Sequence, residues 1–237
     1  MPQHPDGHLR RPDLLPAGYW RPPVLLLLAL AATGCVTSRV EETKNTATGI
    51  SDDESVVILA TSYHQGNKTE ADFLECVNDK LDGGRDSFKI YPGAKFRDDL
   101  FPWFEPRLMP QGIEALPELL ARPGVAQRIS ERGVRYLVWV KGSTERTSGG
   151  GGMSCAASTV GGGCFGLVWW ENEGSYEAAV WDLKKGQHAG DVSTDVHGTS
   201  MVPALIIPLP FVARTQTAAC SGLVRELRQF ITQEGPS

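Results

Sequence analysis

The sequence has no apolar run long enough for a membrane-spanning helix, and it has no excess of positive charge. Its apolar run at residues 24–32 is shorter than the roughly 20 residues that a spanning helix needs. The chain holds 23 Lys and Arg against 28 Asp and Glu, for a net charge of −5. Proteins that bind nucleic acid carry a basic patch or stripe instead. We therefore predict no nucleic-acid partner.

Cysteine is scarce, with five in 237 residues, and the spacing of these cysteines disfavours a metal site. Zinc sites use Cys pairs two to four residues apart, with more Cys or His nearby. Cys155 and Cys164 are further apart, and only His188 and His197 could complete a set. The glycines around this pair lie between two predicted strands with no lysine after them, which also disfavours a phosphate-binding loop. We predict no metal and no cofactor.

Motifs for catalysis are missing as well. Beyond the first 34 residues the histidines are His64, His188 and His197, and none lies in a Gly-x-Ser-x-Gly or His-Glu-x-x-His pattern. Asp191, Asp195 and His197 alternate along one predicted strand, which is typical of a solvated strand face. We assign no catalytic residue, and a hydrolase whose site is not visible in the sequence stays an alternative.

The amino-terminal segment has the features of a targeting signal. Its apolar run follows Arg10, Arg11 and Arg21 and ends in Ala32-Thr33-Gly34-Cys35. This ending resembles a bacterial lipobox, in which the cysteine receives acyl chains such as palmitate and becomes the first mature residue. We predict a signal peptide over residues 1–34 and lipidation at Cys35. By resemblance to Gram-negative lipoproteins, Val36 in place of Asp favours the periplasmic face of the outer membrane. An ordinary secretory signal is the alternative.

The remainder is long enough for one domain with a proper core. Residues 36–54 are rich in Ser, Thr, Glu, Asp and Asn, so we predict that residues 35–54 form a flexible tether after the lipidated cysteine. A single α/β domain is predicted over residues 55–233, with a glycine-rich insertion at residues 144–166.

Apolar periodicity predicts the elements of this domain. The expected strands are 56–60, 87–91, 134–142, 174–183 and 190–198, and the expected helices are 69–81, 113–121, 125–132 and 215–232. This order predicts a mixed central sheet of about five strands with helices packed on it, an α+β sandwich.

Three stretches carry a resemblance to known families: Gly133–Val140, Ala179–Gly186 and Asp191–Gly198. In the order of its elements the chain resembles the α/β domain shared by the curli-secretion lipoprotein family and the amino-terminal domain of the Tol-Pal propeller protein. The resemblance implies this fold; fold alone does not give function.

The oxidising periplasm predicts disulfides for the four remaining cysteines. Cys155 and Cys164 would close the glycine-rich insertion as a hairpin, because glycines let the backbone bend. Cys76 and Cys220 lie on the predicted core faces of the first and last helices and can bond if these helices pack side by side. Buried free thiols are the alternative for this second pair.

Two aromatic clusters are candidates for binding a partner. The first is the segment that holds Phe96, Arg97, Phe101, Trp103 and Phe104. Trp169 and Trp170, which follow the insertion, form the second. Aromatic residues and Arg dominate interface hot spots, but membership of the core is the simpler explanation for each cluster.

We therefore predict a lipid-anchored periplasmic protein that serves as a non-catalytic binding or assembly accessory of the cell envelope, with an unidentified protein partner. One alternative is a ring-forming export-pore subunit. It would need membrane-spanning hairpins of about 9–11 residues per strand, and the insertion looks too short and too polar for them.

Overall fold

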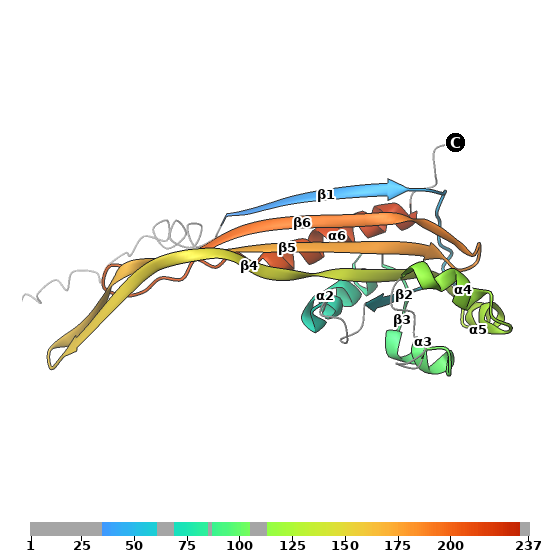
Figure 1. Cartoon of the computed structure of the whole chain (residues 1–237), viewed down its shortest axis with the longest axis horizontal. Coiled ribbons are helices and arrows are strands. Elements are labelled where there is room, and N and C mark those ends of the chain that lie inside the picture. Colours follow the sequence, from blue (N-terminus) through green and yellow to red (C-terminus); the bar gives the residue numbers. More distant parts are fainter. Residues whose placement is uncertain (1–34, 61–68, 85–86, 105–112, 233–237) are drawn as a thin grey trace, which may run out of the picture. The chain divides into compact units, whose positions relative to one another are not determined.

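The computed structural model describes residues 35–60, 69–84, 87–104 and 113–232, all of them within the compact unit Gly34–Ser237 (Figure 1). The predicted signal peptide at residues 1–34 and His64 lie outside the described residues. None of the helices in the described part of the chain is long and apolar enough to cross a membrane.

A mixed six-stranded sheet of order β1-β6-β5-β4-β2-β3 forms the centre of the described unit. Its strands are β1 (Val36–Lys44), β2 (Ser55–Ala60), β3 (Ile90–Tyr91), β4 (Val134–Ser158), β5 (Gly161–Asp182) and β6 (Gln187–Ala204). β2 runs parallel to both β3 and β4, whereas the other pairs are antiparallel. The predicted α+β sandwich is confirmed.

The strand that the sequence did not predict is β1. The tether expected over residues 35–54 is wrong for Val36–Lys44, which pairs with β6 along its whole length, from Val36 opposite Gly198 to Lys44 opposite Gly190. Its side chains are mostly exposed, and Val40 packs against the core. Backbone hydrogen bonds to β6 hold this polar segment in place, so its composition gives no sign of the strand.

Helices cover the two faces of the sheet unequally (Figure 1). The helices are α2 (Ala71–Asp82), α3 (Gly93–Asp99), α4 (Leu116–Leu120), α5 (Val125–Glu131) and α6 (Thr215–Thr232), and a short 3-10 turn, Ile113–Ala115, precedes α4. α6 packs across β1, β5 and β6, with α2 beside it, and encloses the larger core. The smaller core lies on the other face, beneath α3, α4 and α5. Apart from α3, each helix begins within three residues of its predicted start.

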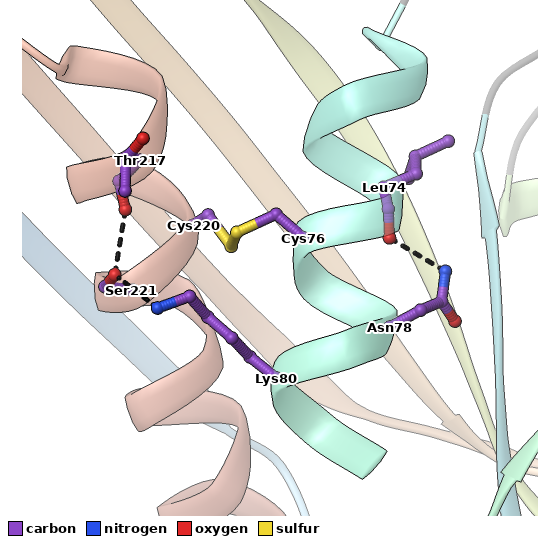
Figure 2. Close-up of a disulfide and its surroundings, with 7 residues drawn as sticks. All are labelled: Leu74, Cys76, Asn78, Lys80, Thr217, Cys220 and Ser221. Carbon is purple, nitrogen blue, oxygen red and sulfur yellow. Dashed lines mark hydrogen bonds between the residues drawn. A yellow bond between two sulfur atoms is a disulfide. The ribbon is translucent and has the colours of Figure 1, made fainter. Parts of the chain in front are cut away.

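A disulfide joins the two helices on the larger core. Cys76 on α2 bonds to Cys220 on α6, as predicted, with the Cα atoms 6.4 Å apart (Figure 2). One turn further on, the Lys80 ammonium donates to the Ser221 hydroxyl at 3.1 Å. Arg228 on α6 also donates to backbone carbonyls of α2 and its C-cap. The first and last helices of the domain are therefore cross-linked side by side.

β4 and β5 continue well past the helix-covered part of the sheet (Figure 1). β2 pairs with β4 only as far as Val140, but β4 and β5 stay in register until Ser158 faces Gly161. The predicted insertion is thus a hairpin extension of two core strands. The expectation that it is short is wrong, since β4 has 25 residues and β5 has 22.

Candidate functional site

Two stretches without any charged side chain meet on the extension of the sheet. Residues 147–170 and 199–213 contain no Asp, Glu, Lys, Arg or His. Strand pairing joins them, from Trp170 opposite Ser200 to Gly166 opposite Ala204. We call the surface that they form the charge-free surface. The two uncharged stretches are visible in the sequence, but this surface was not predicted, because only the strand register shows that they are neighbours.

Large apolar side chains project from this surface into solvent. Phe165, Leu167 and Trp169 alternate along β5 and are 72, 46 and 36% exposed. Since alternate residues of a strand share a face, these three form one row. Met201 lies directly opposite Trp169 and is 41% exposed. Such a run of exposed apolar side chains is uncommon on monomeric proteins and is typical of an interaction surface.

The segment after β6 folds back and extends the same surface. Met201 and Phe211 exchange two backbone hydrogen bonds of 2.8 Å, and the Cys164 N–H donates to the Ile206 carbonyl at 2.9 Å. The turn Leu205–Ile207 is thereby held against the hairpin. Its three side chains are 79, 69 and 70% exposed.

Glycines in β4 make room for the two tryptophans. Gly150 lies opposite Trp169 and Gly149 opposite Trp170. A Cβ atom on Gly149 would lie 3.1 Å from the Trp170 Cβ, and one on Gly150 would lie 3.5 Å from the Trp169 Nε1. The two tryptophans point to opposite faces because they are neighbours on one strand. The Arg146 guanidinium lies 5.3 Å from the Trp170 ring centroid, in cation–π contact at the limit of the charge-free surface.

A second disulfide closes the hairpin near its tip. Cys155 and Cys164 are directly opposite in the strand register and bonded, as predicted, with Cα atoms 4.0 Å apart. The bond locks the register of two glycine-rich strands, which would otherwise be weakly specified.

Cys35 lies at the edge of the charge-free surface. It is exposed and directly precedes β1, and its carbonyl accepts a 3.2 Å hydrogen bond from the Thr199 N–H. A shallow depression beside it is lined by Thr37, Thr147, Glu171, Asn172, His197, Gly198 and Thr199. The last charged residues of the sheet and the first uncharged rows therefore meet at Cys35.

The aromatic segment around α3 is divided between core and surface. Phe96 and Phe104 are 1 and 4% exposed and pack in the smaller core, so the idea that they form a docking surface is wrong. Phe101 is 59% exposed, and Arg97 is exposed as well. Trp103 is partly buried, with the Arg128 guanidinium 5.3 Å from its ring centroid. We call the surface of Arg97, Phe101 and Trp103 the aromatic corner.

Polar contacts connect the aromatic corner and α3 to neighbouring elements. Arg128 donates to the Phe101 carbonyl at 3.2 Å. The Asp99 carboxylate accepts hydrogen bonds from the Tyr91 hydroxyl and from Lys95, and these lower the pKa of Asp99 below its usual value. The Lys95 ammonium also donates to the Tyr91 hydroxyl at 3.0 Å, and this bond together with the one to Asp99 raises the pKa of Lys95. Because α3 is held at both ends, Phe101 is presented from a fixed backbone.

The two predicted aromatic clusters are not brought together. The aromatic corner packs at the end of the sheet where β4 begins, while Trp169 and Trp170 lie on the hairpin extension (Figure 1). They belong to separate surfaces of the described unit.

The histidines form two exposed pairs with carboxylates. The His188 Nε2 is 3.1 Å from Asp191 and the His197 Nε2 is 3.6 Å from Glu173. The side chains of His197 and Glu173 are 60 and 46% exposed, on the sheet face that α2 and α6 leave uncovered. An antiparallel sheet commonly solvates one face in this way. No group of three or more His, Cys, Asp or Glu side chains within the described ranges could hold a metal ion.

No protein-family model and no curated protein sequence matches the chain. Among solved structures, the PelC dodecamer from Paraburkholderia phytofirmans is similar with a TM-score of 0.36 and 11% identity, over 84% of this chain and all of that one. The hypothetical protein CT253 from Chlamydia trachomatis is similar with a TM-score of 0.36 and 10% identity, over 75% of this chain and 98% of that one. At these values neither structure supports an inference about function.

Proposed function

We propose that this chain is a lipid-anchored, non-catalytic accessory protein of the bacterial cell envelope, held at the periplasmic face of the outer membrane by acyl chains on Cys35. Its role is to bind a protein partner of an envelope assembly, export or maintenance system through the aromatic corner.

The position of Cys35 carries this proposal. The residue is exposed and lies at the limit of the charge-free surface, so acyl chains on its sulfur would extend without displacing the core. Its carbonyl accepts a hydrogen bond from Thr199 of β6, and β1 begins at the next residue. No free linker therefore separates the lipid from the fold. The anchor would therefore fix the orientation of the sheet relative to the membrane.

The aromatic corner is suited to a protein partner because it is rigid and partly exposed. Interface hot spots are enriched in aromatic residues and Arg, and a surface that is already ordered loses little entropy on binding. Phe101 has its backbone held by Arg128, and the corner is distant along β4 from the end that would face the lipid.

The test is purification of the tagged full-length protein from its own envelope in mild detergent, with mass spectrometry of the protein and its companions. We expect a stoichiometric protein companion and an acylated mature amino terminus at Cys35. Substituting Phe101→Ala together with Arg97→Ala should remove the companion. The matched control is Arg39→Ala, whose side chain is 78% exposed on β1 and forms an ion pair with Glu41.

Two results would contradict the proposal. A protein that purifies as a monomer with no companion would refute the binding role. An unmodified Cys35 in the mature protein would refute the anchor.

A further inference from the structure

We propose that the charge-free surface docks into the interfacial region of the lipid leaflet that holds the Cys35 anchor, with Phe165, Leu167, Trp169, Met201 and Leu205–Ile207 toward the acyl chains. The inference rests on the proposed anchor for its orientation. The docking itself concerns a separate surface and has a separate readout.

The distribution of charge along the sheet favours lipid as the occupant. Between the helix-covered part of the sheet and Glu171, most rows of paired residues on the face that holds Trp169 carry a charged side chain. Lys141, Glu145 and Glu173 are among them. Beyond Glu171, toward the tip of the hairpin, neither β4 nor β5 carries a charged side chain, and the neighbouring residues 199–213 carry none either. Protein interfaces keep a polar, charged rim, whereas a bilayer excludes charge over a continuous band.

The strand register places Cys35 at the end of β1 that lies next to the charge-free surface. β1 is antiparallel to β6, with Val36 opposite Gly198. Stepping back from Val36 to Cys35 therefore leads in the same direction as stepping forward from Gly198 to Thr199 and Met201. The acyl chains would thus extend toward the charge-free surface and away from the helices.

The residues at the boundary are those that favour a membrane–water interface. Trp169 and Trp170 are the first apolar residues of β5 past Glu171, and tryptophan concentrates at the level of the lipid headgroups. Arg146 lies over Trp170, where its guanidinium could reach headgroup phosphates while its stem stays on the ring.

The backbone of β4 argues for docking at the interface and against immersion in the hydrocarbon. Past Val140 the outer edge of β4 has no strand partner among the described residues. Unpaired N–H and C=O groups are costly in hydrocarbon but are satisfied by water and headgroups. One apolar face with an open polar edge therefore suits a sheet lying in the interfacial layer.

The docking can be tested by tryptophan quenching on the full-length protein purified from membranes. The protein is reconstituted into vesicles of phosphatidylethanolamine and phosphatidylglycerol that contain phosphatidylcholine brominated on its acyl chains. We expect bromolipid quenching in the native protein, which the double substitution Trp169→Phe, Trp170→Phe removes. The matched control Trp103→Phe, at the aromatic corner, should keep it.

A charge on the surface tests the contact without touching the reporters. Ile206→Glu should lower bromolipid quenching severalfold, because a charged side chain resists transfer into the interface. Gln229→Glu, at an exposed site on α6, should leave it unchanged. Near-ultraviolet circular dichroism of each variant reports whether it is folded.

The outcomes separate docking from anchoring. Quenching that survives the double tryptophan substitution, or tryptophans that only aqueous acrylamide quenches, would overturn the docking. Protection from both quenchers in an oligomer would overturn it too, since a second copy would then cover the surface. Mass spectrometry reads acylation of Cys35 independently, so a missing lipid with intact quenching would overturn the anchor and support the docking.

Discussion

The two disulfides close loops of very different length, and this difference predicts unequal contributions to stability. Cys76 and Cys220 are 144 residues apart, whereas Cys155 and Cys164 are 9 apart. In the chain-entropy estimate a disulfide stabilises by restricting the unfolded chain, by about 5 kcal/mol for the longer loop and about 2.5 kcal/mol for the shorter one. The longer bond also lies against the larger core, where Cys220 is fully buried.

We therefore expect Cys76→Ala with Cys220→Ala to lower the free energy of unfolding about twice as much as Cys155→Ala with Cys164→Ala. Because whole domains are stable by only about 5–15 kcal/mol, the first variant should be close to unfolding at 37 °C. Alanine is chosen because a serine hydroxyl would be buried without a partner.

The assay is urea unfolding followed by tryptophan fluorescence. Reducing the variant that keeps only the Cys76–Cys220 bond separates the cross-link from the packing of the sulfur atoms, since reduction breaks the bond without removing them. An equal or larger loss for the Cys155 and Cys164 variant would refute the reasoning. It would mean that native-state strain, and not loop entropy, governs these bonds.

Two further predictions concern a carboxylate and a pair of glycines. Burial alone would raise the pKa of Glu54, but hydrogen bonds from Lys184, the Ser51 N–H and Arg135 outweigh it and lower the pKa below the ordinary 4.5. This lowered pKa stabilises the fold above about pH 4.5, and the contribution is lost as the pH falls through the folded-state pKa. Glu54→Gln should therefore reduce the change in the urea midpoint between pH 6 and pH 3. The exposed Glu118→Gln should not. Gly142 has φ +131°, and an added Cβ would lie 2.1 Å from the Ser175 carbonyl oxygen, so Gly142→Ala should cost more than about 2 kcal/mol of unfolding free energy. Gly152→Ala, with open space around it, should change stability by less than about 0.5 kcal/mol, and equal effects at the two glycines would contradict this account.

Periodicity in the sequence was sufficient where side chains alone decide the structure. The stripe on Thr215–Thr232 predicted α6 with both ends correct, and it placed Cys220 on the buried face where it meets Cys76. The break expected between the strands 174–183 and 190–198 was also correct, and Gly186 lies in it at φ +65°. In each case the signal lies within a few neighbouring residues.

Two elements left no comparable signal. β1 is polar and is held by its backbone to a strand about 150 residues further along the chain. α3 begins directly after Pro92 and buries only Phe96, so seven residues gave too short a pattern to predict a helix. The aromatic segment was ambiguous for a related reason, because composition does not tell which of Phe96, Phe101 and Phe104 point inward.

The sequence by itself determined the class of fold, the pairing of Cys155 with Cys164, the helix that covers the core, and the absence of charge from two separate stretches, because each depends on residue type and local spacing. Only the tertiary structure decided that α2 and α6 pack side by side so that Cys76 and Cys220 bond, that the two uncharged stretches form one surface, and that Cys35 lies at its edge. It also decided that, of Phe96, Phe101 and Phe104, Phe101 is the exposed one. Strand register between distant segments sets these features. It is fixed by backbone hydrogen bonds and by packing across the sheet, which no local pattern of residues records.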